Sequence, residues 1–405
     1  MDWSFLIRNK ESLLVSTDTR NLPVGCVFFA LHGANFDGNK FAKQALEQGA
    51  SLAVIDNPDY ALPEGTLLVP DTLLALQELA RAWRRELSLP IIAITGTNGK
   101  TTTKELLAAV LSTKYNIHYT QGNLNNQIGV PLTLLQVTRA HEMAIVEMGA
   151  SHPGDIKELV DIAEPNYGLI TNVGRAHLEG FGSFEGVQRT KQELYDYLVA
   201  HDGTIFRNAD NSYLAEMEKR ATQSYTTLHN PTQCYTTGTM PSGTNLVGGY
   251  NAENVSAAMC VGEHFGISPE QGLVAIRAYV PTNNRSQQMQ TPNNQLVVDA
   301  YNANPTSMQA AINAFKGDTY ILGAMRELGD YTHLEHQNVV NMLAERKAEL
   351  VFLVGEEYLQ TTSPYPVYET VEQLHEYLEA NPLKGKKILL KGSRSTKMEK
   401  LLDIL

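Results

Sequence analysis

The chain has 405 residues, which is too long for one ordinary hydrophobic core and predicts two or three domains. Its hydrophobic content of 43% and charged content of 19% are typical of globular proteins, and no apolar stretch is long enough to span a bilayer. The formal net charge of −12 argues against a nucleic-acid partner, because phosphate backbones select basic surfaces. No signal-peptide pattern is visible, and three widely spaced cysteines indicate neither a disulfide framework nor a zinc site. These features favour a cytoplasmic protein.

Strand-like and helix-like patterns alternate through most of the chain, which predicts an α/β fold. The first domain is expected over residues 1–85. Its predicted elements are a strand at 27–31, a helix at 40–48, a strand at 51–55 and a helix at 72–87 that leads into the next domain.

A phosphate-binding loop is the most informative feature of the second domain, which is expected over residues 86–282. Four apolar residues at 91–94 predict a buried strand, and a glycine-containing turn, Lys-Thr and a helical pattern follow. Glycines let the backbone wrap a phosphate, and the helix N-terminus attracts the anion. The general pattern has glycine where this chain has Ile94, so the loop is a compact form. The predicted ATP-binding residues of this segment are Gly96, Thr97, Asn98, Gly99, Lys100, Thr101 and Thr102.

Polar residues follow other predicted strands of the second domain, at 144–146 and 167–171. Carboxylates at the carboxyl ends of strands face the ligand crevice of open α/β sheets, so Glu147 becomes a candidate magnesium ligand beside the Thr101 hydroxyl. The turn after the later strand gathers further candidates, Arg175 and His177. A loop rich in amides can donate to and accept from a polar substrate, although turn chemistry also favours such residues. Its candidate residues are Asn125, Asn126 and Gln127.

The third domain is expected over residues 283–405, after a polar, proline-marked linker at about 281–284. Helical patterns between its strands predict a small, doubly wound, Rossmann-like domain. The predicted strands are 296–298, 320–322, 350–354 and 388–390. Asp299 can accept hydrogen bonds from a ribose, and the asparagines that follow it can hold a peptide. The candidate residues after Asp299 are Tyr301, Asn302 and Asn304.

Taken together, these segments resemble the Mur ligase family, whose members join amino acids to carboxylates, and the resemblance covers all three domains. The strings 301–305 and 322–329 are similar to those of the members that join D-alanyl-D-alanine to UDP-N-acetylmuramoyl-tripeptide. The resemblance therefore implies these two substrates, an acyl-phosphate intermediate and a monomer. It also implies a UDP-sugar-binding first domain, a central ATPase domain and a C-terminal domain that binds the incoming dipeptide. In the first domain it implies three substrate-binding residues, Thr19, Arg20 and Asn35.

The same resemblance implies further roles in the second and third domains. ATP would also contact Asn254, Arg285 and Asp299, and Lys100, His177 and Lys191 would be catalytic. Lys191 matches the lysine that the family carbamylates with carbon dioxide, although by itself it would be taken as a surface helix lysine. As a carbamate it would join His177 at a second magnesium ion, whereas Thr101 and Glu147 would hold the first. One departure is Tyr250, where the family often has histidine.

Three alternatives remain open from the sequence. A sister ligase that forms the tripeptide would carry an Asp-Asn-Pro-Arg motif in its last domain, whereas residues 56–59 are Asp-Asn-Pro-Asp and lie in the first domain. A folylpolyglutamate synthase would lack the domain that residues 1–85 supply. A phosphate-loop switch that makes no product is the third alternative, and a GTPase of that kind would need an Asn-Lys-x-Asp segment, which the chain lacks.

Overall fold

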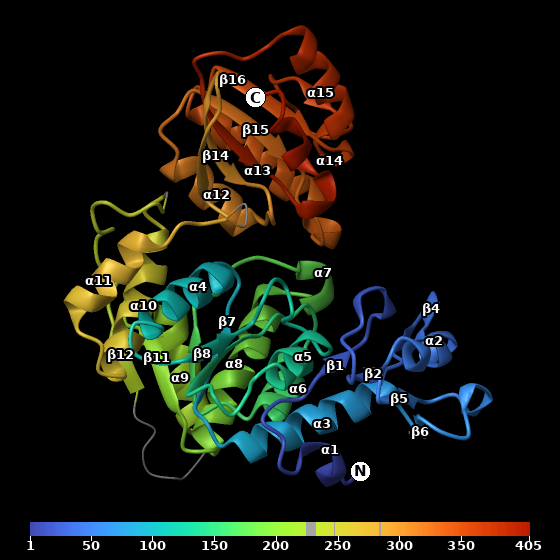
Figure 1. Ribbon diagram of the computed structural model, residues 1–405. Coiled ribbons are helices and arrows are strands. Elements are labelled where there is room, and N and C mark those ends of the chain that lie inside the picture. Colours follow the sequence, from blue (N-terminus) through green and yellow to red (C-terminus); the bar gives the residue numbers. More distant parts are fainter. Residues whose placement is uncertain (224–231, 247, 283–284) are drawn as a thin grey trace.

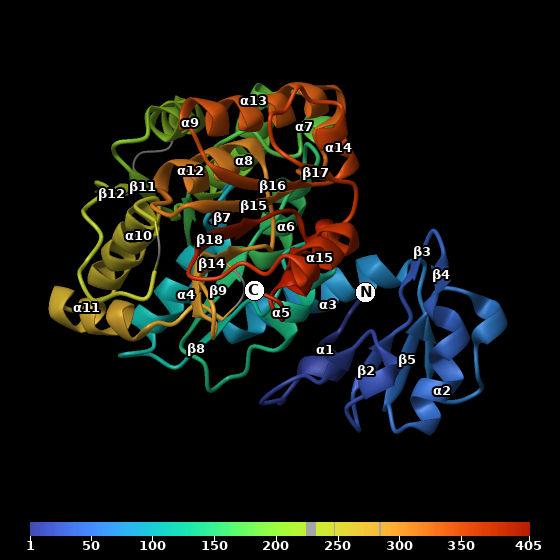
Figure 2. The ribbon, with the colours of Figure 1, turned by 90° about the horizontal axis from the view of Figure 1, so that it is seen from above.

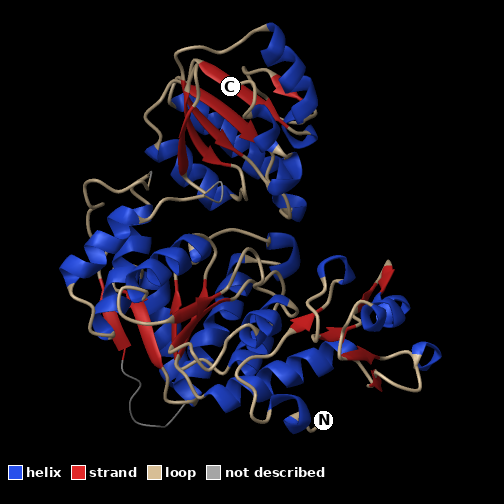
Figure 3. Ribbon diagram, viewed as in Figure 1, coloured by secondary structure: helices blue, strands red, loops and turns tan. Residues whose placement is uncertain are grey.

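The computed structural model describes residues 1–223, 232–246, 248–282 and 285–405, and these residues form three units, each with a mainly parallel sheet (Figures 1 and 3). Asn283 and Asn284 of the predicted linker lie outside the described residues. In the view from above, the C-terminal unit covers the central unit and the N-terminal unit lies to one side (Figure 2). No helix in the described parts of the chain has the length and apolar character needed to cross a membrane.

The N-terminal unit is built on a parallel sheet with the order β1-β2-β5-β6. Its strands and the small antiparallel hairpin β3-β4 are β1 (Val15–Ser16), β2 (Val27–Phe29), β3 (His32–Gly33), β4 (Phe36–Asp37), β5 (Leu52–Ile55) and β6 (Thr66–Leu68). Its helical elements are α1 (Ser4–Ile7), η1 (Thr19–Asn21), η2 (Gly38–Phe41), α2 (Ala42–Glu47) and η3 (Pro58–Tyr60). The helix predicted at 40–48 is thus divided, because Asp37 caps a separate 3-10 turn by accepting from the Asn39 N–H.

Helix α3 (Thr72–Leu87) connects the N-terminal and central units. The Asp71 carboxylate caps its first turn by accepting from the Leu74 N–H at 2.8 Å. The apolar face of the helix packs into a core shared with the central unit, and the Trp83 indole N–H donates to the Val137 carbonyl at 2.8 Å. The helix therefore belongs by its packing to both units, across the boundary predicted at residues 85 and 86.

The central unit has a fully parallel six-stranded sheet with the order β12-β11-β10-β7-β9-β8. Its strands are β7 (Ile91–Thr95), β8 (Ile117–Tyr119), β9 (Met143–Glu147), β10 (Tyr167–Ile170), β11 (Thr204–Asn208) and β12 (Thr232–Tyr235). Its helices are α4 (Lys100–Leu111), α5 (Gly129–Leu135), α6 (Asp155–Ala163), α7 (Leu178–Phe181), α8 (Phe184–Ala200), α9 (Ser212–Gln223), α10 (Asn251–His264) and α11 (Pro269–Ala278). Strand β7 reads as a continuous apolar run because alternate residues enter the cores on the two faces of the sheet.

The C-terminal unit has a six-stranded sheet with the order β13-β14-β18-β15-β16-β17, in which only the edge strand β13 is antiparallel. Its strands are β13 (Gln287–Gln290), β14 (Gln295–Asp299), β15 (Thr319–Gly323), β16 (Leu350–Val354), β17 (Val367–Tyr368) and β18 (Lys387–Lys391). Its helical elements are α12 (Pro305–Ala314), η4 (Gly329–Tyr331), α13 (Thr332–Glu345), α14 (Glu356–Leu359), α15 (Val371–Ala380), η5 (Arg394–Thr396) and η6 (Met398–Leu401). Apolar cores cover both faces of this sheet, as in doubly wound folds.

Candidate active site

The loop after β7 has the backbone that the sequence predicts for a phosphate loop. Gly96 and Gly99 have φ angles of +142° and +81°, which favour glycine. Space demands glycine as well, since a Cβ atom on Gly96 would lie 2.0 Å from the Thr171 hydroxyl oxygen and one on Gly99 would lie 2.5 Å from Asn254 Oδ1. Asn254 therefore packs directly behind the loop, and it also accepts a hydrogen bond from the Thr103 hydroxyl at 3.1 Å.

The segment after β10 supports this loop from the side. The Thr97 N–H donates to the Asn172 carbonyl at 2.9 Å, and the Asn98 N–H donates to Asn172 Oδ1 at 3.0 Å. The Thr171 hydroxyl donates to the Asn98 carbonyl at 2.6 Å. Two of the loop N–H groups are thus engaged within the chain, so an anion depends on the first turn of α4, where helices leave N–H groups without intrahelical acceptors.

Lys100 is the first residue of α4, and its ammonium group lies over the phosphate loop. Lys100 Nζ donates to the Gly96 carbonyl at 2.7 Å and to the Thr97 carbonyl at 3.2 Å. Burial lowers the pKa of Lys100 to about 8, with nearby Arg285 adding to the shift and Glu147 opposing it. The residue is therefore placed to meet the phosphates of a nucleotide bound at the loop.

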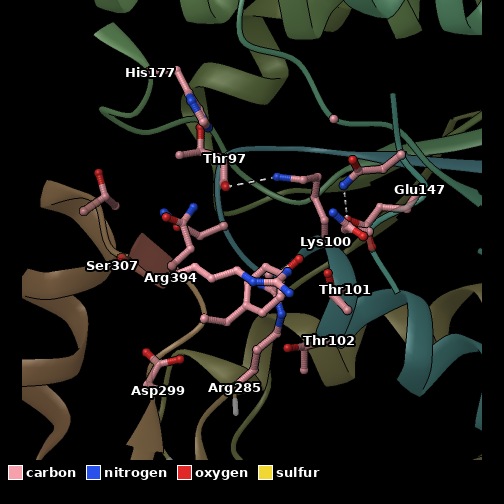
Figure 4. Close-up of a pocket in the computed structure, with 18 of the residues that line it drawn as sticks. Thr97, Lys100, Thr101, Thr102, Glu147, His177, Arg285, Asp299, Ser307 and Arg394 are labelled. Atoms are coloured by element: carbon pink, nitrogen blue, oxygen red, sulfur yellow. Dashed lines mark hydrogen bonds between the residues drawn. The ribbon is translucent and has the colours of Figure 1, made fainter. Parts of the chain in front are cut away.

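Glu147 is the last residue of β9 and is only 1% exposed. Its Oε1 accepts from Asn125 Nδ2 at 2.8 Å, as the dashed line in Figure 4 marks. Its Oε2 is buried, accepts no hydrogen bond from the described residues and lies 3.8 Å from Lys104 Nζ. A buried carboxylate oxygen without a donor fits a hard cation, and magnesium characteristically binds one or two carboxylates together with substrate phosphates and water. The described residues contain no group of three His, Cys, Asp or Glu side chains that would hold a metal ion by themselves.

Lys191 lies on α8 and is 3% exposed, so reading it as a surface helix lysine is wrong. Its Nζ lies 5.7 Å from the centre of the Phe181 ring, and the described residues place no carboxylate within ion-pair distance. Burial lowers the pKa of Lys191 well below its ordinary value, the charge of Lys100 adds to this shift, and the carboxylates of Asp155 and Glu193 oppose it. Such an environment favours the uncharged amine.

His177 connects the central and C-terminal units. It has a left-handed backbone conformation with φ of +50°, and its ring Nδ1 contacts the Glu327 carboxylate across the domain boundary. Burial lowers the pKa of His177, the charges of Lys100 and Lys191 add to the shift, and Glu327 opposes it.

A cleft of about 860 Å³ lies between the central and C-terminal units. Figure 4 shows Lys100, Thr101 and Glu147 on one side and Asp299 and Arg394 on the other. The sequence-predicted residues that line it are Thr97, Asn98, Gly99, Lys100, Thr101, Thr102, Asn125, Asn126, Gln127, Glu147, His177, Asn254, Arg285, Asp299, Tyr301 and Asn302.

The remaining candidates lie outside the lining of this cleft. Gly96 directly follows β7 and Lys191 lies on α8, both in the central unit. Thr19 and Arg20 belong to η1, where Arg20 pairs with Asp18 at 2.6 Å, and Asn35 occupies the turn of the β3-β4 hairpin. The structure therefore does not bring these three residues of the N-terminal unit into the cleft.

Arg175 and Asn304 contribute to docking between the two units. The Asn98 and Asn304 side-chain amides exchange hydrogen bonds at 2.8 and 3.4 Å. The Arg175 guanidinium pairs with Glu335 at 3.1 Å, and its backbone N–H donates to the Thr306 hydroxyl at 3.1 Å. The phosphate loop is thus in direct contact with the N-cap residue of α12.

Besides the predicted Arg285 and Asp299, the C-terminal wall of the cleft contains charged residues that the sequence did not single out, among them Lys391 and Arg394. Lys391 is 1% exposed and pairs with Asp299 at 2.6 Å, because the two residues are register partners at the ends of β18 and β14. The Arg285 and Arg394 guanidiniums lie 3.9 and 5.4 Å from the centre of the Tyr301 ring. Arg326 and Glu327 of the same wall were also missed, as was Lys104 on α4 of the central unit, which lies outside the cleft lining. The sequence offered a signal for each of them. Lys391, Arg326 and Glu327 lie at or soon after the ends of predicted strands, and Lys104 lies one helical turn after Lys100 of the phosphate loop.

Tyr250 also lines the cleft, where the family often has histidine. Its hydroxyl group hydrogen-bonds the Ser286 hydroxyl at 2.6 Å, and the Ser286 N–H donates to Asp299 Oδ1 at 3.3 Å. Tyr250 is therefore linked through Ser286 to the predicted ribose contact.

The fold and the cleft define a phosphate-loop enzyme whose last domain covers the nucleotide site. Three protein-family models match the sequence. The model described as "Mur ligase family, catalytic domain" matches residues 14–84, and the model described as "Mur ligase middle domain" matches residues 94–262. The model described as "Mur ligase, glutamate ligase domain" matches residues 284–394. The chain belongs to the Mur ligase family.

Curated relatives and solved structures agree with this assignment. UDP-N-acetylmuramoyl-tripeptide–D-alanyl-D-alanine ligases from Bacillus subtilis and Escherichia coli are each 35% identical over 96% of this chain, and the matches cover 92% and 93% of the relatives. A structure of MurF from Acinetobacter baumannii has a TM-score of 0.83 and 29% identity, covering 96% of this chain and 92% of its own. MurF from Thermotoga maritima in complex with ADP has a TM-score of 0.85 and 25% identity, covering 97% of both chains. The predicted family, three-domain α/β fold and ligase class are confirmed.

Proposed function

We propose that this chain joins D-alanyl-D-alanine to the terminal carboxylate of UDP-N-acetylmuramoyl-tripeptide, with conversion of ATP to ADP and phosphate. The proposal is supported by ligases of that name that match this chain over nearly its whole length. The observation that carries it is the cleft, in which a phosphate loop faces a second domain lined with cationic and amide groups.

The chemistry explains why ATP is needed. A carboxylate is a poor electrophile, because it is anionic and its oxygen is a poor leaving group. In the proposed reaction a carboxylate oxygen attacks the γ-phosphorus, and the bond to ADP breaks. The dipeptide amine then attacks the acyl carbon, loses a proton, and phosphate leaves with the bonding electrons. The protein must place charged reactants together and neutralise the phosphoryl group in transit.

Within this reaction the first turn of α4 and the Lys100 ammonium hold the nucleotide phosphates. Asn254 keeps Gly99 in place from behind, and Arg285 and the Asp299–Lys391 pair face the nucleoside. The amides of Asn126 and Gln127 face the nucleotide-linked peptide from the cleft wall. We propose that Thr19, Arg20 and Asn35 contact the UDP-sugar on the N-terminal unit and that the chain acts as a monomer.

Magnesium fits the central side of the cleft. Glu147 Oε2, which lacks a donor, and the Thr101 hydroxyl are the residues that would hold the first ion. His177 and Lys191 would serve a second one. Bound there, magnesium would supply positive charge next to the transferring phosphoryl group.

The carbamate on Lys191 rests on the environment of the amine. Only the uncharged amine adds to carbon dioxide, forming a C–N bond with loss of one proton. The low pKa of Lys191 and its burial without a carboxylate partner among the described residues favour that form. The product is a carbamate, whose anionic oxygen can bind a cation. The ammonium group that it replaces cannot do so.

The test is phosphate release coupled to product formation, with each substrate omitted in turn. We expect phosphate release to require ATP, UDP-N-acetylmuramoyl-tripeptide and D-alanyl-D-alanine together, with product at equal stoichiometry. L-alanyl-L-alanine and free D-alanine serve as matched controls and should support little turnover. Release of phosphate without a dipeptide would contradict the proposal and favour an ATPase that makes no peptide product.

A further inference from the structure

Arg326 lines the cleft a few residues after β15 and is held in place by two groups of its own domain. Its Nε donates to the Ser395 hydroxyl at 3.2 Å, and its Nη1 contacts the Glu357 carboxylate. The Glu357 side chain is 14% exposed, whereas that of Arg326 is 49% exposed. A guanidinium has five N–H donors, so about three remain for a ligand on the open side.

Glu327, the next residue, is oriented differently. It has a left-handed backbone with φ of +61°, its side chain is 60% exposed, and its carboxylate contacts His177 of the central unit. The consecutive residues Arg326 and Glu327 carry opposite charges and contact different partners, Glu357 and His177. The cationic group is anchored within the C-terminal unit, and the anionic group lies next to the phosphate-loop side of the cleft.

Ser393 lies just after the end of β18, the strand that pairs with β15. Ser393 lines the cleft and its backbone N–H donates to the Ala324 carbonyl at 3.3 Å, two residues before Arg326. Ser393 is 3% exposed, and its hydroxyl oxygen is buried with no hydrogen-bond partner among the described residues. Ser393 and Arg326 therefore line the same cleft, and a hydroxyl without a partner and a guanidinium with free donors are both suited to an acceptor anion.

We infer that Arg326 binds the C-terminal carboxylate of the incoming dipeptide, with the dipeptide amine on the Glu327 side. This inference rests on the proposed function, because a free dipeptide is a zwitterion with one charge at each end. Two extended residues span about 7 Å, so the two ends need separate sites. The amine must reach an acyl carbon near the phosphate loop, which places it toward His177 and places the carboxylate toward Arg326. Arg326 is therefore a specificity-determining residue.

The experiment compares D-alanyl-D-alanine with D-alanyl-D-alaninamide, which has the same amine and no carboxylate, as substrates of the full-length enzyme. For the wild type we expect kcat/KM to fall at least tenfold with the amide. Arg326→Ala should raise the KM for D-alanyl-D-alanine about tenfold, as loss of a charge-assisted hydrogen bond implies. The variant should treat both dipeptides nearly alike and keep its KM for ATP and for UDP-N-acetylmuramoyl-tripeptide.

Two further variants test whether the effect comes from the positive charge of Arg326 and not from a general loss of an arginine. Arg326→Gln keeps the length and polarity of the side chain and should also lose discrimination against the amide. Arg346→Ala removes a guanidinium from α13's C-terminal end, outside the cleft lining, and should behave as wild type. Wild-type discrimination retained by either Arg326 variant would overturn the inference, as would equal use of both dipeptides by the wild type. Failure of the wild type to use any dipeptide would instead refute the proposed function.

Discussion

Lys191 offers the sharpest test of how the site is built, because two interpretations of this lysine predict different magnitudes. An ammonium that pairs on a surface contributes about 0–1 kcal/mol, which corresponds to at most about a fivefold effect. The structure does not support that interpretation, since Lys191 is 3% exposed and has no carboxylate partner within ion-pair distance among the described residues. If the residue holds magnesium as a carbamate, its removal should lower kcat by about 10²-fold or more, as loss of a preorganised charged contact does.

We would compare two substitutions of Lys191 that leave different volumes at its position. Lys191→Ala opens room for a small carboxylic acid next to α7, whereas Lys191→Met fills the volume of the lysine stem. We expect both to lose activity, and acetate to restore part of it only in Lys191→Ala, because acetate and a carbamate present similar oxygens. Lys157→Ala is the control, since Lys157 is 68% exposed and pairs with Asp161 on α6.

The assay is steady-state phosphate release with and without acetate, together with ¹³C NMR of enzyme equilibrated with ¹³C-bicarbonate. A carbamate resonance should be present in the wild type and in Lys157→Ala and absent from both Lys191 variants. Full activity of Lys191→Ala without acetate would refute the metal-bridging role. A wild type that is fully active but shows no carbamate resonance would refute the modification itself.

Lys100→Ala should lower kcat by about 10²–10³-fold with little change in melting temperature, because it removes a charge next to the phosphates; near-normal turnover would contradict the phosphate-loop assignment. Small-angle scattering should give a smaller radius of gyration with an ATP analogue and UDP-N-acetylmuramoyl-tripeptide bound than without them, since the cleft has walls from two units; equal dimensions at saturation would count against domain closure. Burial lowers the pKa of His118 to about 4, so the unfolded chain binds more protons between pH 4 and 6.5. The contribution of His118 to stability should therefore be complete above pH 6.5 and fall by up to about 3 kcal/mol toward pH 4, and His118→Phe should reduce the slope in denaturant titrations by that amount; an unchanged slope would contradict the assignment.

Much of the fold was predictable because its signals are local. The helix predicted at 72–87 has those limits in the structure, where an aspartate cap starts it and the left-handed Ser88 ends it. The strand at 350–354 is likewise found as predicted, because a five-residue apolar run between polar segments is typical of a buried parallel strand. Local signals fixed these elements without any knowledge of the tertiary contacts. The domain limits at 85 and 282 stay predictions; at 85, the packing of α3 against both units leaves no sharp boundary.

The phosphate loop was the most directly predictable part of the site, because its residues belong to one continuous segment. Every residue from Thr97 to Thr102 lines the cleft, because a strand, a turn and a helix start place them together. Contacts between distant segments were not visible in the same way. The pairing of Asp299 with Lys391 depends on strand order, and the docking of Arg175 onto Glu335 depends on how two units meet. Neither the order of the strands nor the orientation of the units is encoded by a local pattern.

The compact phosphate loop shows how such distant contacts change a local interpretation. From the sequence, the glycine turn was expected to wrap a phosphate and the helix N-terminus to attract it. In the structure, Asn172 accepts from two of them, which fixes the loop while leaving the anion to the first turn of α4. Asn98, whose backbone is held in this way, carries its side-chain amide to Asn304 of the C-terminal unit. Asn98 therefore both shapes the phosphate loop and contacts the covering domain, which places one residue at the junction of the two units.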